Sequence, residues 1–374
     1  MKIGIEAQRI FRKNKHGMDY VVLQEIREIQ KMDTPHEYFI YVAPGEDVCL
    51  EDTANVHVRI IKCPTYPLWE QVALPRAAKR DGVQLLHCTS NTAPICCAIP
   101  LVLTLHDIIF LEPRDKRNKS LYQNMGWAYR RLVVPRILKK CRRIITVSDF
   151  ERKNIIDKLG LPEEQIVRIY NGYNEHFAPY AHTKSKEVSG GEKHAKGKDY
   201  FFFLGNTDPK KNTERTLIAY SKYLQKSEIK RKLLIADLSD EYISDILTRN
   251  GIEGVKPYIT SPGYIVNSEL PRVYGEAFAF LYTSLRESFG IPLLEAMACG
   301  TPVITSSTSS MPEIAGPEAV LINPEDADDI AAMMLRLEQD EAFYKQQRAT
   351  GLERVKLFSW RKTAEELLQL YDRM

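Results

Sequence analysis

Residues 278–304 read FAFLYTSLRESFGIPLLEAMACGTPVI and contain, in order, a strand, a glycine turn, a helix and a second strand. The apolar run Phe278 to Tyr282 has the length and composition of a buried strand. Gly290 lies in the turn, where the missing side chain lets the backbone approach another group closely. Pro292 suits the first turn of a helix, because the N–H that proline lacks would have no helical partner there. Gly300 is placed to end that helix, so the stretch predicts one strand–helix–strand unit of a parallel sheet.

The same alternation extends over the whole chain. Short apolar runs alternate with longer segments of helical period, which indicates parallel sheets covered by helices on both faces. Ten runs are predicted to be strands: residues 3–5, 38–42, 57–60, 85–88, 101–105, 143–147, 201–204, 232–236, 278–282 and 302–304. The predicted fold class is therefore α/β, with two doubly wound, Rossmann-like domains. Two such domains facing each other would form a cleft at the carboxyl ends of their strands, where these sheets bind ligands.

The boundary between the two domains is predicted at residues 184–198, which read KSKEVSGGEKHAKGK. This segment contains three glycines and many charges, and it has too few apolar side chains to form a core, so it is expected to be a linker or a mobile loop. The first domain would then cover residues 1–183 and the second residues 199–357.

The composition narrows the class of protein. Of 374 residues, 44% are hydrophobic and 27% charged, which is typical of a globular protein rather than a disordered one. The net charge of +3 gives no reason to expect a nucleic-acid partner. The seven cysteines show no metal-ligand spacing, and no signal peptide or apolar run long enough to cross a bilayer is evident. We therefore expect a cytoplasmic location.

One segment departs strongly from the average charge. Residues 114–143 contain eleven lysines and arginines and one acid, Asp115, which gives a local charge of +10. Apolar residues at 132–134 and 137–138 are interleaved with these cations. A basic amphipathic segment of this kind suits an anionic membrane surface. It is equally compatible with a solvated helix whose apolar stripe packs on the sheet, and both interpretations stay open.

Chemically useful side chains follow several predicted strands. Glu287 and Glu295 flank the turn at Gly290, and the start of a helix after a glycine turn is a natural anion site. Lys210 and Lys211 lie near the end of the segment FLGNTDPKKN, residues 203–212, where they could stabilise the charge on a leaving diphosphate. His106 follows the strand at 101–105. Each of these residues, taken alone, could also be a solvated or structural residue.

Together these segments resemble a known family. Glu287-SFGIPLL-Glu295, followed by AMACGTPV and MPEIAG, resembles the signature of the family-four retaining glycosyltransferases, which have the GT-B fold. Residues 203–212 are similar to the family's G-x-x-x-P-R-K-N element, with Lys210 at a place often held by arginine. LTLHD, residues 103–107, is similar to its T-x-H-D element. The loop ending at Gly17 resembles the family's glycine loop, although His16 replaces the first glycine.

The resemblance implies a role for each matching residue. His106 and Glu287 would contact the transferred sugar and act in catalysis. Glu295 would hold the ribose hydroxyls, and Lys210 and Lys211 the diphosphate. Backbone N–H groups at residues 289–291 would bind the sugar, and those of Leu293 and Leu294 the phosphate. The implied donor-binding residues are Gly17, Gly205, Lys210, Lys211, Ser288, Phe289, Gly290, Ile291, Leu293, Leu294 and Glu295.

The implied reaction moves a hexose, with its anomeric configuration retained, from a nucleotide-diphosphate sugar to a saccharide or lipid-linked acceptor in surface polysaccharide synthesis. A donor of the GDP-mannose type is favoured, and UDP-sugars come next. No cofactor and no metal are expected, because two lysines, Lys210 and Lys211, replace the cation. Residues 358–374, which begin FSW, resemble a C-terminal helical segment that packs back on the first domain. Relatives that use lipid-linked acceptors suggest a peripheral position at the inner membrane face.

Two alternatives to this function remain. A sugar phosphorylase or a nucleotide-sugar epimerase would use the same fold for a different reaction, and analysis of the products would separate these activities. A non-catalytic, membrane-associated partner subunit would show no donor turnover, and substitution of Glu287 or Lys211 would hardly affect it.

Overall fold

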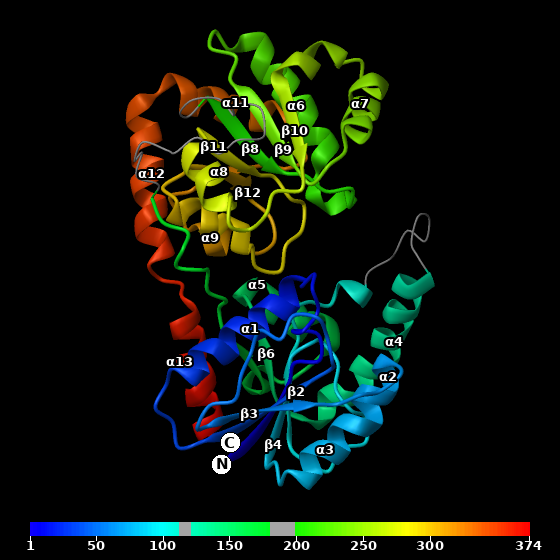
Figure 1. Cartoon of the computed structure of the whole chain (residues 1–374). Helices are drawn as coiled ribbons and strands as arrows, with labels where there is room; N and C mark the ends of the chain where they lie inside the picture. The colour runs from blue at the N-terminus through cyan, green and yellow to red at the C-terminus, as the bar shows by residue number, and fades with distance from the viewer. Residues whose placement is uncertain (112–120, 180–198) are drawn as a thin grey trace. The chain divides into compact units, whose positions relative to one another are not determined.

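The computed structural model describes residues 1–111, 121–179 and 199–374, with the side chains of 121–123 left aside (Figure 1). The chain divides into two compact units. The first unit contains residues 1–172 and 360–374, and the second contains residues 173–359.

The first unit is built on a seven-stranded parallel sheet with the strand order β3-β2-β1-β4-β5-β6-β7. In the described part of the unit its strands are β1 (Lys2–Glu6), β2 (Glu37–Val42), β3 (Val56–Ile60), β4 (Leu85–Cys88), β5 (Leu101–Thr104), β6 (Cys141–Thr146) and β7 (Ile166–Arg168). Its helices are α1 (Gly17–Gln30), α2 (Tyr66–Leu68), a π-helical turn (Trp69–Ala73), α3 (Leu74–Arg80), α4 (Leu121–Ile137), α5 (Asp149–Leu159) and α13 (Trp360–Asp372), with 3₁₀ turns at Ile109–Leu111, Leu138–Lys140 and Glu163–Gln165.

Side-chain alternation along the strands places a core on each face of this sheet. In β2, Phe39 and Tyr41 belong to one apolar cluster, which also contains Val134 of α4. Tyr38 and Ile40 belong to a second cluster, which also contains residues of α1 and α13. Because successive side chains of a strand point to opposite faces, the sheet needs a helical layer on each side.

The second unit repeats this plan with six parallel strands in the order β10-β9-β8-β11-β12-β13. Its described strands are β8 (Tyr200–Leu204), β9 (Lys232–Ala236), β10 (Ile259–Gly263), β11 (Ala279–Tyr282), β12 (Val303–Ser306) and β13 (Val320–Ile322). Its helices are α6 (Thr213–Lys226), α7 (Asp240–Arg249), α8 (Leu270–Glu276), α9 (Ile291–Ala298), α10 (Met311–Ala315), α11 (Ala327–Gln339) and α12 (Glu341–Val355), with 3₁₀ turns at Pro209–Lys211 and Glu253–Tyr258.

In both sheets the order of the strands reverses at one point. The strand order runs outward in one direction from β1 and in the other from β4, and in the second unit the same reversal separates β8 from β11. At such a switch point the loops at the carboxyl ends of the two strands turn to opposite faces, which opens a place for ligands. The α/β prediction of two Rossmann-like domains is confirmed. Ligand sites are expected at the switch points of the two sheets.

Three strands were not predicted, namely β7, β10 and β13. Each lies at an edge of its sheet and is paired with a single neighbour. An edge strand is covered less completely than a central one, so its apolar run can be short or interrupted. Strands β7 and β13 have three residues each. Residues 259–263, ITSPG, illustrate an interrupted run, since all five are at least partly exposed.

The change of unit falls between Gly172 and Tyr173, which differs from the boundary predicted at residue 183. The physical reason is Phe177, which is 2% exposed and packs edge-on against Tyr274 of α8, with ring centroids 6.0 Å apart. The predicted linker, residues 184–198, lies outside the described residues. The C-terminal helix α13 belongs to the first unit and lies beside α1 (Figure 1). There the Tyr371 hydroxyl is 2.7 Å from Nδ1 of His87.

The described part of the basic segment predicted at 114–143 covers α4, the 3₁₀ turn Leu138–Lys140 and the start of β6. Residues 114–120 lie outside the described part. Four of the apolar residues predicted to alternate with cations are buried in the core of the first unit: Val133, Val134, Ile137 and Leu138. Leu132 and Met125 stay exposed, at 51% and 63%. The apolar stripe therefore packs on the sheet. Among the described helices, none is both long enough and apolar enough to cross a membrane.

Candidate functional site

In the second unit the predicted site residues gather at the switch point between β8 and β11. Gly205 directly follows β8, and its N–H donates a hydrogen bond of 3.0 Å to the carbonyl of Ala236. A Cβ at this position would lie 2.5 Å from Cγ of Leu238 and 2.8 Å from the Ala236 carbonyl oxygen. Only glycine fits this close approach, so chain packing alone requires glycine at position 205. Donor binding by Gly205 stays a prediction.

The turn that carries Lys210 and Lys211 is hydrogen-bonded to the segment that follows β11. The Asp208 carboxylate accepts a hydrogen bond of 3.2 Å from the Lys210 N–H, and the Lys210 carbonyl accepts one of 2.7 Å from the Leu285 N–H. Asn212 has a left-handed backbone conformation, with φ of 61°, and its side-chain amide donates to the carbonyl of Thr283 at 3.0 Å. These contacts hold both lysines beside the loop that follows β11.

Lys211 and Glu287 form an ion pair in which Nζ lies 2.5 Å from Oε1. Their side chains are 25% and 12% exposed, so the pair is mostly shielded from solvent. The Lys211 ammonium also lies 5.7 Å from the centroid of the Tyr282 ring. The lysine expected to bind phosphate and the acid expected to bind sugar are thus in direct contact. Lys210 is half-buried and its side chain has no ion-pair partner in the described part of the chain.

Two serines that no sequence pattern singled out hold the backbone around Glu287. The Glu287 N–H donates to Oγ of Ser309 at 3.1 Å. The Ser310 hydroxyl lies 3.0 Å from the carbonyl oxygens of both Glu287 and Phe289. The available signal was the run SSTSS at residues 306–310, which begins at the last residue of β12 and precedes the MPEIAG segment.

Gly290 and the start of α9 form the predicted anion site. Gly290 has φ of 108°, which strongly favours glycine, and a Cβ there would lie 3.3 Å from Cε1 of Tyr282. The Leu293 N–H donates to the Gly290 carbonyl at 3.0 Å, and Pro292 has no N–H. The N–H groups that remain without a described hydrogen-bond partner in this turn belong to Gly290 and Ile291. The Leu293 N–H, predicted to bind phosphate, is therefore already used within the turn.

The other predicted residues of this turn contribute mainly to packing. The side chains of Leu293 and Leu294 are completely buried. Phe289 is 4% exposed, and its ring packs edge-on against Phe358 with centroids 6.0 Å apart. Ser288 is half-buried between Glu287 and Phe289. These side chains fix the backbone path, and any ligand contact here would have to come from backbone groups.

Glu295 lies one turn into α9 and is half-buried. Burial raises the pKa of Glu295 to about 8, and the nearby Tyr274 hydroxyl offsets part of the rise. That hydroxyl makes no hydrogen bond of normal geometry with the described residues. Burial also raises the pKa of Tyr282, with a further contribution from Glu287 beside it and a smaller one from Glu295. Tyr282 therefore lies near both acids of the E-x7-E motif.

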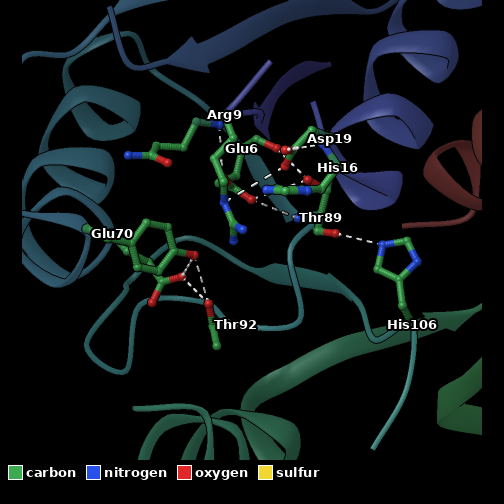
Figure 2. A network of polar contacts seen from close by, with 10 residues as sticks. Glu6, Arg9, His16, Asp19, Glu70, Thr89, Thr92 and His106 are labelled. Atoms are coloured by element: carbon green, nitrogen blue, oxygen red, sulfur yellow. Dashed lines mark hydrogen bonds and ion pairs between the residues drawn. The ribbon is translucent and has the colours of Figure 1, made fainter. Parts of the chain in front are cut away.

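In the first unit, His106 follows β5 and is 7% exposed. Its Nε2 is 3.0 Å from the Thr89 carbonyl oxygen (Figure 2). Its backbone N–H donates to Oδ1 of Asn91 at 2.7 Å. Burial lowers the pKa of His106, opposed by the hydrogen bond to Thr89 and by the charge of Asp107. The histidine is therefore a fixed, neutral group at the carboxyl edge of the sheet.

Gly17 is the first residue of α1. A Cβ there would meet no atom within 4 Å, so the packing of the chain does not require glycine at this place. The preceding residue, His16, donates its backbone N–H to Asp19 at 3.0 Å and so begins the helix. Gly17 differs in this respect from Gly205, which internal packing requires.

Glu6 was not singled out from the sequence, although it is completely buried at the end of β1. Its carboxylate accepts hydrogen bonds from the backbone of Gln8 and from Thr89. A charged residue immediately after the first apolar strand was the signal that could have indicated it. No group of three or more His, Cys, Asp or Glu side chains placed to hold a metal occurs among the described residues.

The structure brings the predicted residues together in two sets. One set, around Gly205, Lys211, Glu287 and Gly290, lies at the β8–β11 switch point of the second unit. The other set, His106 and Gly17, lies at the carboxyl edge of the first sheet. Two Rossmann-like sheets with these sites define a glycosyltransferase of the GT-B class.

Comparison with known proteins supports this class. Residues 185–354 match the family described as Glycosyl transferases group 1, and residues 16–177 match Glycosyltransferase Family 4. O-antigen chain mannosyltransferase B of Escherichia coli is 30% identical over 282 residues, which are 72% of this chain and 69% of that protein. The chain belongs to the family-four glycosyltransferases.

Two further comparisons extend this result. The serotype-specific mannosyltransferase WbdA of Escherichia coli is 28% identical over 235 residues, which are 62% of this chain. The match spans 29% of that relative. Sucrose-phosphate synthase from Thermosynechococcus elongatus shares the fold with a TM-score of 0.73 at 21% identity, over 100% of this chain and 98% of that one.

Proposed function

We propose that the enzyme transfers a hexose from a nucleotide-diphosphate sugar, with the anomeric configuration retained, to a saccharide or lipid-linked acceptor in surface polysaccharide synthesis. A GDP-mannose-type donor is favoured over UDP-sugars. The observation that carries the proposal is the ion pair of Lys211 and Glu287 beside the Gly290 turn, at the β8–β11 switch point. The O-antigen mannosyltransferase among the relatives supports mannose and polysaccharide synthesis.

Donor binding would begin at cations and donors that are unused in the free protein. Lys210 has no described ion-pair partner, and the N–H groups of Gly290 and Ile291 have no described hydrogen-bond partner. A diphosphate placed there would be bound by a cation, by two N–H groups and by the positive end of α9. Glu295 would hold the ribose hydroxyls, which its acceptor oxygens suit.

The Lys211–Glu287 pair would then change partners. Diphosphate oxygens compete with the Glu287 carboxylate for the Lys211 ammonium, and charge-assisted hydrogen bonds to phosphate are strong in a shielded site. Glu287, once released, would accept a hydrogen bond from a hydroxyl of the transferred sugar. In the free enzyme Lys211 and Glu287 would thus neutralise each other's charge until the donor binds.

The chemical step follows from these contacts. The bond between the anomeric carbon and the diphosphate oxygen breaks, and the positive charges of Lys210 and Lys211 stabilise the departing diphosphate. The acceptor oxygen bonds to the same face of the anomeric carbon, and its proton passes to a diphosphate oxygen. His106 contacts the transferred sugar. We propose that no metal takes part, because the two lysines supply the positive charge that a cation would supply.

The test is donor binding and donor hydrolysis by the purified protein across GDP- and UDP-sugars in the presence of EDTA. We expect one donor to be bound and slowly hydrolysed, and Glu295→Ala and Lys211→Ala each to lose this activity. Glu214→Gln is the control, because this exposed acid on α6 pairs with Arg249 on the surface. If no nucleotide sugar binds at millimolar concentration, the donor-site assignment is wrong.

We also propose that the exposed face of α4 rests on an anionic membrane surface, which would place a cytoplasmic enzyme at the inner face. Arg131, Leu132 and Arg136 lie on this face and are exposed, and Met125 is 63% exposed. Basic side chains near such a surface contribute about 1 kcal/mol each. Arg131→Glu with Arg136→Glu should release the protein from vesicles containing anionic lipid, while Lys222→Glu on α6 should not. Equal binding to neutral vesicles would contradict the proposal.

A further inference from the structure

Three residues at the carboxyl edge of the first sheet form a buried hydrogen-bonded series. Glu6 ends β1, Thr89 follows β4, and His106 follows β5 (Figure 2). The order of the sheet places these three strands side by side, and β1 and β4 flank the switch point. Glu6, Thr89 and His106 are 0%, 2% and 7% exposed.

In each described hydrogen bond of the Glu6 carboxylate, the partner is a donor. Oε1 accepts from the Gln8 N–H at 3.0 Å. Oε2 lies 3.3 Å from the Thr89 N–H and 3.2 Å from its hydroxyl, which also lies 2.7 Å from the Glu6 carbonyl oxygen. A carboxylate suits this set because it only accepts, whereas a primary amide would turn its own N–H groups toward donors. Glu6 therefore fixes the backbone at Thr89.

The Thr89 backbone in turn decides where the His106 ring carries its proton. Nε2 of His106 is 3.0 Å from the Thr89 carbonyl oxygen, which can only accept. Nε2 must therefore carry a hydrogen, and in a neutral imidazole Nδ1 is then an acceptor. Nδ1 makes no hydrogen bond with a described residue. The hydrogen bond from the His106 backbone to Asn91, which has φ of 66°, fixes the other end of the residue.

The surroundings keep the ring neutral. Burial lowers the pKa of His106, while the hydrogen bond to Thr89 and the charge of Asp107 act in the opposite direction. The neighbouring His87 adds no positive charge at neutral pH, because burial lowers its pKa to about 3. In a neutral ring whose Nε2 hydrogen is bonded to Thr89, Nδ1 can accept a hydrogen bond from a ligand, and the ring has no further proton to donate.

We propose that Glu6 is a positioning residue which, through Thr89, holds His106 with Nδ1 as a hydrogen-bond acceptor, so that the enzyme selects a donor sugar with a hydroxyl at this place over its deoxy analogue. The inference rests on the proposed function, since it takes His106 to contact the transferred sugar. A site built to bond a hydroxyl rejects an analogue that lacks one, because a buried polar group is then left without a partner. In this arrangement His106 binds the sugar and gives no proton to the leaving group.

The protonated nitrogen is measured first, on the free enzyme, by ¹⁵N NMR of histidine-labelled protein at pH 7. His106→Gln identifies the signals of this ring among the eight histidines. We expect a protonated, pyrrole-type Nε2 and an unprotonated, pyridine-type Nδ1. A proton on Nδ1, or on both nitrogens, would overturn the inference. Because this measurement needs no substrate, it stands apart from the proposed function, whose failure would show as absent donor turnover.

Glu6→Gln tests the positioning role, with Glu37→Gln as the matched control on the neighbouring strand β2, where the carboxylate is 40% exposed. We expect Glu6→Gln to give a mixture of both neutral forms of the His106 ring. It should also lower roughly tenfold the preference, in kcat/KM, for GDP-mannose over the GDP-deoxymannose that lacks the contacted hydroxyl. The control should change neither quantity.

A second variant covers the case in which Glu6→Gln does not fold. Thr89→Val removes the hydroxyl but keeps the carbonyl that accepts from His106, and it should reduce the same preference by a smaller factor. A folded Glu6→Gln enzyme with an unchanged ring signal and an unchanged preference would show that Glu6 has no positioning role.

Discussion

Lys211 and Glu287 should respond in opposite ways to substitution when a nucleoside diphosphate is bound. The two groups pair at 2.5 Å in a site where neither side chain is more than 25% exposed. If the diphosphate takes Lys211 from Glu287, removing the lysine loses the phosphate contact. Removing the negative charge of Glu287 frees the lysine in advance and strengthens binding of the diphosphate.

The magnitude follows from the charges. Two unit charges about 4 Å apart interact by roughly 4 kcal/mol at the effective dielectric constant of a protein surface site. Part of this is lost because Lys211 must leave Glu287, so we expect Lys211→Ala to weaken GDP binding by about 2 kcal/mol, or roughly thirtyfold. Glu287→Gln should strengthen GDP binding by a few-fold, yet lower sugar transfer by about a hundredfold, because the contact with the sugar is lost.

Isothermal titration calorimetry with GDP, together with a transfer or hydrolysis assay, separates the two effects. Glu214→Gln is the control, because its pair with Arg249 is exposed on both sides, at 48% and 49%. If Glu287→Gln weakens GDP binding as much as Lys211→Ala does, the two residues act as one structural pair. The exchange of partners on donor binding would then be wrong.

Further predictions concern acidity, backbone space and metal. Burial raises the pKa of Glu295 to about 8 from the ordinary value of 4.5. Between pH 4.5 and 8 the folded enzyme therefore keeps a proton that the unfolded chain releases. The free energy of unfolding then falls as the pH rises through this range. Glu295→Gln should therefore raise the free energy of unfolding at pH 7 by about 1–2 kcal/mol. Nucleotide binding by the native enzyme should become stronger toward pH 8, and the variant should not show this increase. A variant whose free energy of unfolding keeps the native pH dependence in denaturant titrations would refute this. Gly205→Ala should destabilise the fold by about 2 kcal/mol or more, because its Cβ would lie 2.5 Å from Leu238, whereas Gly17→Ala should keep the melting temperature and weaken donor binding. Equal thermal shifts in the two variants would contradict this distinction. Treatment with EDTA should leave transfer unchanged, and activity restored only by a divalent cation would show that the two lysines do not suffice.

The central strands could be predicted from the sequence because parallel strands covered on both faces are continuous apolar runs. Residues 201–204 and 279–282 show this pattern, and both lie inside the second sheet. The edge strands were missed for two reasons. The residues of β10 are at least partly exposed and include polar ones, whereas β7 and β13 have three residues each, too short a run to stand out as a strand. The boundary at Gly172 was missed because the residues after it, such as Phe177, pack on the second unit while lacking any regular element.

The second-unit site was predictable because its turn, its helix start and both acids lie within one short stretch. The first-unit series was not, because Glu6, Thr89 and His106 are brought together by the order of the strands. The contact from Thr89 to Glu6 joins residues 83 positions apart. Likewise, the Lys211–Glu287 pair joins residues 76 positions apart, and each sequence motif showed only one of its members.

The proposed activity is mannosyl transfer with retention, and the anomeric configuration of the product tests it most directly. The purified enzyme would be given GDP-α-mannose with EDTA, and the anomeric proton of the newly formed mannoside, or of freshly released mannose, would be followed by NMR. We predict that the α anomer appears first, and that Lys211→Ala does not produce it at a measurable rate. Initial formation of the β anomer, or turnover of UDP-sugars alone, would contradict it.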